Sequence, residues 1–234
     1  MSAHKNRKKE YFDGVRAALP VILGFVPVGI AYAVMAHDAG FSALETVLMS
    51  LLVFAGASQM MAVGMYAQGA GLVAIITAAF IINLRHVIMS TCLFNRMGNT
   101  PLALRIISSA GVTDETFAIF TTSDEKRCTP AFFLGLVSVA YLSWAMGSLI
   151  GALASEALPT LVSASLGIAM YAMFIGLLVP SLRGNGRLAL LVVITACVNT
   201  ALSQVMTSSW ALIVSTLVCA FAGVFFVDLG EDAA

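Results

Sequence analysis

Three polar residues interrupt an apolar run near the middle of the chain, and their types suit the binding of an ion or a zwitterion. The run is "IINLRHVIMS", residues 81–90, and its polar members are Asn83, Arg85 and His86. A charged side chain at the centre of a bilayer costs about 2.5–3.5 kcal/mol on insertion scales, so it must be paired or must face water. Because an arginine stays charged at any physiological pH, Arg85 needs an anion.

The nearest acidic residues lie in the next apolar segment, "GVTDETFAIF", which places Asp114 and Glu115 at its centre. We predict that Arg85 pairs with one of them. Two interpretations stay open: an ion pair that only locks the fold, or a polar cavity that binds a zwitterion. In the second, Arg85 or free helix N–H groups hold a carboxylate, and Asp114 or Glu115 holds an ammonium. Asn83 would add an amide, and His86 would either carry a coupled proton or simply pack.

A second polar patch lies in "VFAGASQMMAVG", where Ser58 and Gln59 follow Gly56 inside a strongly apolar stretch. These side chains either form hydrogen bonds between helices or contribute to the same binding site. A third patch, "CVNTALSQVM", places Asn199 and Ser203 four residues apart, which puts them on one face of a helix.

The stretch "LPVILGFVPVGIAY" combines Pro27 with Gly24 and Gly29. A proline inside a helix removes one hydrogen bond and disturbs the preceding turn, so we predict a kink that serves either as a hinge or as a packing feature. Further along, "GSLIG" at 147–151 has small residues four apart, a spacing that favours close contact with another helix.

The composition places all these residues in a membrane. Hydrophobic residues make up 60% of the 234 residues and charged residues only 10%, whereas soluble domains are about a quarter charged. The apolar runs are continuous, which predicts an all-α polytopic membrane bundle and disfavours a β-barrel. A net charge of zero gives no indication of a nucleic-acid partner, and four widely spaced cysteines predict neither a metal site nor disulfides; no cofactor is expected.

Eight segments are candidates for crossing the membrane, of which two are doubtful because their centres are polar or their apolar runs short. The doubtful ones are 72–94 and 105–122, and we expect them to be broken or re-entrant, which gives six to eight membrane segments. The remaining six are 17–36, 44–66, 131–153, 164–179, 188–206 and 210–227.

The distribution of Lys and Arg predicts the orientation, because cytoplasmic loops carry more of them. Residues 1–16 form a basic segment that we place in the cytoplasm, residues 17–228 a single transport domain, and residues 229–234 a short acidic tail, also cytoplasmic. Arg96 and Arg105 fall on the cytoplasmic side if the doubtful pair re-enters and outside if it crosses. The first apolar stretch is too long for a signal peptide, so we expect it to be retained as a helix.

In this order, the segments "GVRAALPVILGFVPVGIAYAV", "MSLLVFAGASQMMAV", "FIINLRHVIMS" and "GVTDETFAI" resemble the AzlC family, the large subunits of branched-chain amino acid exporters. The resemblance covers the first half of the chain. It implies export of branched-chain amino acids, with methionine as a further substrate, and a small AzlD-like membrane subunit as partner. It transfers no residue roles, so those of Arg85, His86 and Asp114 rest on the solvation argument.

We therefore expect a secondary transporter in the cell (inner) membrane that works by alternating access, with proton coupling as a further option. The chain carries no Walker motif for ATP hydrolysis. One alternative is a non-transporting scaffold subunit. Another is an intramembrane hydrolase built on Ser58 and His86, although "GASQ" lacks the closing glycine of a nucleophile elbow.

Overall fold

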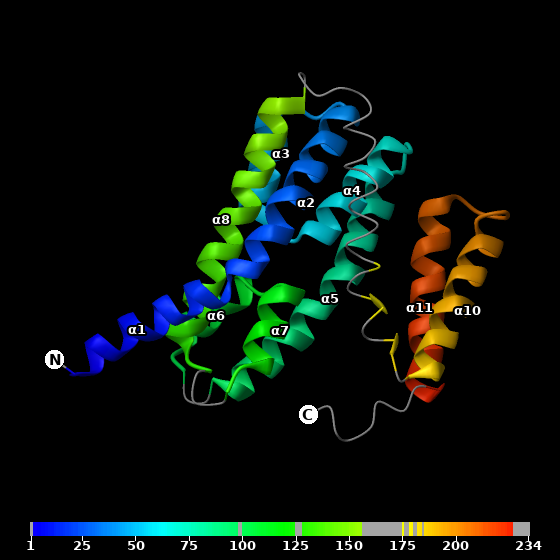
Figure 1. The fold of residues 1–234 in the computed structure, drawn as a ribbon. Coiled ribbons are helices and arrows are strands. Elements are labelled where there is room, and N and C mark those ends of the chain that lie inside the picture. Colours follow the sequence, from blue (N-terminus) through cyan, green and yellow to red (C-terminus); the bar gives the residue numbers. More distant parts are fainter. Residues whose placement is uncertain are drawn as a thin grey trace.

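The computed structural model describes residues 2–97, 100–124, 128–155 and 185–226, together with positions 175, 178, 179, 182 and 183. In these ranges the regular elements are ten helices (Figure 1). Three of them are long and apolar enough to cross a membrane: α2 (Leu19–Asp38), α5 (Leu72–Arg96) and α8 (Pro130–Ala154). The predicted all-α membrane fold is confirmed.

The helix α5 corrects one prediction. The segment 72–94 was expected to break or re-enter, yet it forms one unbroken helix of 25 residues. Its polar side chains Asn83, Arg85 and His86 find partners or cavity space beside the helix, so its backbone hydrogen bonds need not open. Apolar turns on both sides of this polar centre complete the length that a crossing requires.

The prediction for the segment 44–66 was also wrong. It was expected to form one continuous crossing, but it divides into α3 (Ala43–Val53) and α4 (Gly56–Ala67). The break lies at Phe54, whose backbone is left-handed with φ of 43°. This conformation costs a residue with a side chain about 1–2 kcal/mol. The buried ring of Phe54 packs edge-on against Phe25 and Tyr141, with centroids 6.5 and 5.0 Å away, which offsets that cost.

The helices α3 and α4 form a hairpin that returns to the end of the bundle where it began. α3 runs antiparallel to α2, because Phe54 packs on Phe25 while the Tyr32 hydroxyl donates to the Thr46 carbonyl at 3.2 Å. At the far end of α4, Tyr66 packs against the ring of Phe41, just before α3 starts, with centroids 5.0 Å apart. We call α3–α4 the first hairpin and residues 54–55 its tip.

The doubtful segment 105–122 is broken, as predicted, into α6 (Leu102–Ala110) and α7 (Asp114–Thr122). These two helices form a second hairpin, with its tip at residues 111–113, that enters and leaves at the opposite end of the bundle. At that end the Arg96 guanidinium, at the end of α5, donates to the Thr121 carbonyl, and Arg105 lies over the ring of Phe94 at 5.6 Å.

Among the described residues between 45 and 124, α5 is the helix that is long and apolar enough to cross a membrane. The segments 72–94 and 105–122 were expected to be broken or re-entrant, whereas the segments that are divided in the structure are 44–66 and 105–122. On this path Arg96 and Arg105 lie at the same end of the bundle as the start of α2, as the orientation argument prefers.

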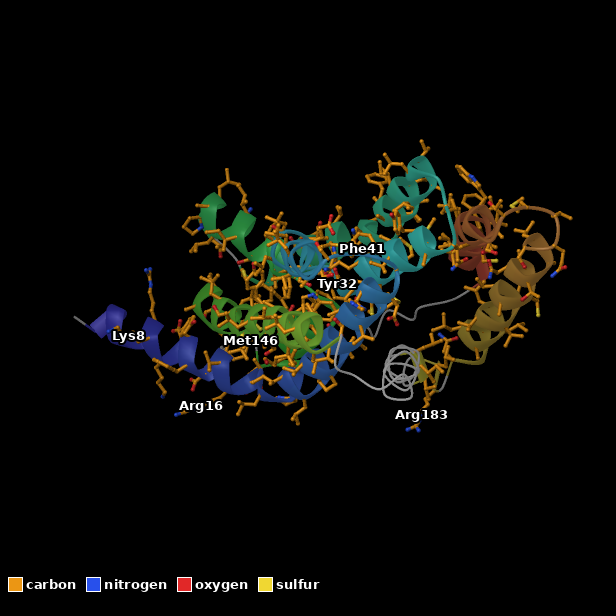
Figure 2. The ribbon with its side chains drawn as sticks, turned by 90° about the horizontal axis from the view of Figure 1, so that it is seen from above. Lys8, Arg16, Tyr32, Phe41, Met146 and Arg183 are labelled. Carbon is orange, nitrogen blue, oxygen red and sulfur yellow. The ribbon has the colours of Figure 1, made fainter. Side chains whose placement is uncertain are left out.

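The remaining helices complete the bundle. α1 (Ser2–Ala17) packs on the first half of α8, and Figure 2 shows Lys8 and Arg16 projecting from its exposed sides. The antiparallel pair α10 (Gly186–Leu202) and α11 (Ser208–Phe226) matches the predicted segments 188–206 and 210–227 and lies to one side of the other helices. The predicted segment 164–179 and the acidic tail 229–234 fall almost entirely or wholly outside the described residues.

The helices α2 and α8 form the most extensive contact in the described part of the chain, and "GSLIG" mediates it as predicted. A Cβ atom on Gly147 would lie 2.6 Å from the Val26 carbonyl oxygen, and one on Gly151 would lie 2.7 Å from that of Ile30. The two backbones therefore approach as closely as only glycine allows.

We expect Gly147→Ala to lower the melting temperature of the purified protein in detergent, because α8 must move away from α2. Overpacking of this kind costs roughly 1–3 kcal/mol. The matched control is Gly24→Ala on α2, where a Cβ would meet no atom within 4 Å. Equal melting temperatures for the two variants would show that the close contact does not stabilise the bundle.

Candidate functional site

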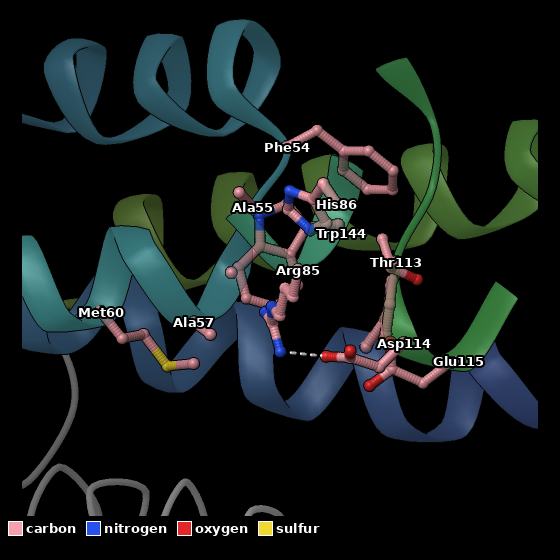
Figure 3. Close-up of a pocket in the computed structure, with 12 residues that line it drawn as sticks. Phe54, Ala55, Ala57, Met60, Arg85, His86, Thr113, Asp114, Glu115 and Trp144 are labelled. Carbon is pink, nitrogen blue, oxygen red and sulfur yellow. Dashed lines mark hydrogen bonds and ion pairs between the residues drawn. The ribbon is translucent and has the colours of Figure 1, made fainter. Parts of the chain in front are cut away.

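The tips of the two hairpins face each other across the middle of α5, and a cavity of about 40 Å³ lies between them (Figure 3). A cavity of this size holds one or a few water molecules. Its lining comes from both tips, from α5 and from aromatic residues of α2 and α8. The lining residues are Phe25, Phe54, Ala55, Gly56, Ala57, Met60, Arg85, His86, Thr113, Asp114, Glu115 and Trp144.

The predicted ion pair is present in this cavity. The Arg85 guanidinium on α5 donates to a carboxylate oxygen of Asp114, the first residue of α7 (Figure 3). The two side chains are 34% and 37% exposed, so they face cavity space and are not sealed in the packing. Glu115 lies beside Asp114 on the same helical turn, and His86 follows Arg85 on α5.

The two helix N-termini at the tips differ in their electrostatics. α7 begins with a capping box, in which Thr113 and Thr116 satisfy each other's backbone N–H groups, and its first turn carries Asp114 and Glu115. α4 begins at Gly56 with neither a side-chain cap nor an acidic residue in its first turn. Uncapped N–H groups and the helix dipole attract anions. The α4 end therefore favours a carboxylate, whereas the acidic α7 end favours a cation.

Asn83 and Ser58 lie behind this cavity and support its wall. The Asn83 amide donates to the Ser58 hydroxyl at 3.2 Å, and that hydroxyl donates to the Ala55 carbonyl at 2.9 Å. The hydroxyl thus satisfies a backbone group at the tip of the first hairpin. Asn83 Oδ1 and Arg85 Nε are buried and have no hydrogen-bond partner among the described residues, so both could serve a ligand or water.

Gln59, proposed as a site residue, does not line the cavity. Its side chain is fully buried, donates to Ser50 at 3.2 Å and accepts from the Trp144 indole at 3.1 Å. Ser50 in turn shares a hydrogen bond of 2.7 Å with Ser148. Gln59 therefore joins α3, α4 and α8, and it fixes the ring of Trp144 against the tip of the first hairpin.

The proposed hinge residues of α2 also lie away from the cavity. α2 continues as one helix through Pro27. Gly29 packs against α8, where an added Cβ would lie 3.1 Å from the Ser148 nitrogen, and Gly24 faces open space. A hinge at these positions stays a prediction. Phe25, from the same stretch, is the residue that reaches the cavity.

Sequence reasoning missed the aromatic part of the site. Trp144 stacks on Tyr32 with centroids 5.9 Å apart and contacts Phe25 edge-on at 5.7 Å. One signal was available: tryptophan is enriched at membrane interfaces, whereas Trp144 lies in the interior of a predicted crossing. Phe54 gave no comparable signal, because the sequence around it is apolar throughout.

Comparison with known proteins places this site inside a shared region. Residues 20–158, which include both hairpins and every lining residue, match the family model described as AzlC protein. An uncharacterized membrane protein of Archaeoglobus fulgidus is 35% identical over 185 residues, or 78% of this chain and 81% of that protein. No solved structure matches the chain.

Two further relatives carry more specific names. The inner membrane protein YgaZ of Escherichia coli is 29% identical over 218 residues, which cover 89% of this chain and 87% of that protein. The branched-chain amino acid transport protein AzlC of Bacillus subtilis is 25% identical over 157 residues, or 64% of this chain and 61% of that protein.

Proposed function

The chain belongs to the AzlC family of membrane proteins, and from this premise we propose that it is a secondary transporter that exports branched-chain amino acids. A role in membrane transport follows from the family. The substrate class is supported by the name of the Bacillus subtilis relative and by the chemistry of the cavity between the hairpin tips. Methionine, an unbranched apolar amino acid, is a further candidate substrate.

The pairing of an anion-binding and a cation-binding helix end carries this proposal. A zwitterionic amino acid would place its carboxylate at the uncapped N-terminus of α4, within reach of Arg85, and its ammonium at Glu115 and Asp114. Arg85, Asp114 and Glu115 together carry a formal charge of −1 when ionised. That surplus suits the ammonium, while the free N–H groups of α4 suit the carboxylate.

The apolar wall of the cavity would receive the substrate side chain. Phe25, Phe54, Met60 and Trp144 form this wall, and all four are buried. At about 40 Å³ the cavity is too small for an amino acid, so binding requires the tips to separate. The hairpins enter from opposite ends of the bundle, so movement of one or the other would open the site to alternate sides.

Coupling, partner and orientation complete the proposal. His86 lines the cavity beside Arg85 and is the candidate proton carrier. We propose the inner membrane as the location, with both termini in the cytoplasm, and a small AzlD-like membrane subunit as partner.

The alternatives predict different behaviour. A scaffold subunit would need the Arg85–Asp114 pair only for folding. A hydrolase would need Ser58 activated by His86, but the Ser58 hydroxyl donates to the Ala55 carbonyl and accepts from the Asn83 amide. Ser58→Ala would abolish activity in a hydrolase and leave export largely intact in a transporter.

Efflux of labelled leucine, valine and methionine from proteoliposomes tests the proposed function. The chain is reconstituted with and without its small partner, and a pH gradient is imposed or omitted. We expect leucine and valine to leave faster than from liposomes without the protein. The pH gradient should accelerate this efflux if a proton is coupled to transport. If leucine leaves no faster than from protein-free liposomes even with the partner present, the proposal is contradicted.

A further inference from the structure

A second, much larger cavity lies beside the site between the hairpin tips. It measures about 740 Å³ and is bounded by α2, α4 and α5 on one side and by α10 and α11 on the other. One face of α4 lines it along its whole length with Ala57, Met60, Met61, Gly64 and Met65, and Gln68 continues the lining just after the helix. We call this cavity the vestibule. It is large enough for an amino acid, which the site cavity is not.

Two residues of α4 are shared by the linings of the vestibule and the site cavity. Ala57 and Met60, one helical turn apart on α4, line both cavities, and Figure 3 shows them next to each other along α4. Met60 is only 4% exposed, so its side chain is packed where the linings of the two cavities meet. A methionine side chain is unbranched and adapts readily to its surroundings. A change of its rotamer would join the two cavities without moving a helix.

The vestibule extends toward one end of the bundle. Gln68 follows the last residue of α4, Ser208 is the first residue of α11, and Met35 lies in the last turn of α2. These positions share the end where the first hairpin enters, opposite to the end that holds Arg96. In the orientation predicted from the basic residues, this end faces outward.

We propose that the vestibule is the exit route for the substrate and that Met60 is the gate between it and the site. This inference rests on the proposed function. Its ligand class is amino acids with apolar side chains, because Met61, Ile81 and Leu212 offer an apolar surface for the side chain. Asn199 and Thr216 offer polar groups to the charged end. Export would then end with passage along α4.

A reporter cysteine at Ala55 tests the gate, because Ala55 lines the site and is not among the vestibule residues. A membrane-impermeant methanethiosulfonate reagent is added outside right-side-out vesicles, and modification at position 55 is followed by mass spectrometry. We expect slow modification with Met60 present and at least about tenfold faster modification in Met60→Ala. Met65→Ala is the matched control, since Met65 lines only the vestibule, and the rate should stay slow.

A second measurement leaves Met60 unchanged. Ile81→Cys in the vestibule should react with the same reagent. Phe80→Cys should not, because Phe80 is 66% exposed on the outer face of α5, where we expect lipid to cover it. The gate proposal would be contradicted if these two cysteines reacted equally. It would also be contradicted if position 55 were modified at equal rates in Met60→Ala and Met65→Ala, or if the reagent reached it only from the cytoplasmic side. Labelling needs no transported substrate, so its result is independent of the export assay. The proposed role of Met60 can be supported even if leucine is not exported, and it can be contradicted even if leucine is exported.

Discussion

Replacing Asp114 with asparagine is expected to lower leucine export by roughly 10- to 100-fold. The variant leaves Arg85 in the cavity without its carboxylate partner and removes one negative charge from the ammonium side of the site. Hydrogen bonds to charged groups contribute about 1.5–3 kcal/mol, and each 1.4 kcal/mol corresponds to a tenfold change in rate. The measurement is the initial rate of efflux from proteoliposomes that contain equal amounts of folded protein.

The double variant Arg85→Gln/Asp114→Asn separates a transport role from a purely structural one. If the pair only locks the fold, removing both charges should restore stability and export together, because neutral replacement of an ion pair is often tolerated. We expect a melting temperature near that of the wild type and export that stays low. Asp38→Asn, at the exposed end of α2, is the control for loss of a carboxylate elsewhere.

Gly56→Ala is expected to reduce export by at least about tenfold while the protein still folds. A Cβ at this position would lie 2.6 Å from the outermost ring carbon of Trp144, so the ring or the first turn of α4 must shift. This turn carries the N–H groups proposed to hold the carboxylate. A displacement of about 1 Å in a positioning element can cost about a hundredfold in rate.

Gly71→Ala, directly before α5, is the matched control, because a Cβ there meets no atom within 4 Å and Gly71 lines neither cavity. It should export at nearly the wild-type rate. The two variants should also differ in the apparent Michaelis constant for leucine, which we expect to rise in Gly56→Ala. Equal export by both variants would show that the start of α4 does not need its present position for transport.

The sequence allowed the central ion pair to be predicted because burial of a charge has a large and general cost. Arg85 had to find an acid, and Asp114 lay in the next apolar segment. The break before α7 was also predictable, since "GVTDE" combines a glycine, a capping threonine and acids in a first helical turn, which together are typical of a helix start.

The break at Phe54 could not be predicted in the same way. The run from 44 to 66 is apolar, and a left-handed conformation at a phenylalanine is stabilised here by tertiary packing on Phe25 and Tyr141. No local pattern encodes such packing. The prediction that segment 72–94 would break was wrong for a related reason. The polar centre of α5 faces the cavity and the first hairpin, so the helix did not have to break.

Competition by leucine analogues tests most directly whether a zwitterion is held between the two helix ends. Unlabelled leucine, 4-methylpentanoate, which lacks the ammonium, and 3-methylbutylamine, which lacks the carboxylate, are compared as inhibitors of labelled leucine efflux by the wild-type protein. We predict that only leucine competes strongly and that both single-charge analogues are at least about tenfold weaker. Inhibition by either analogue as strong as that by leucine would contradict the account.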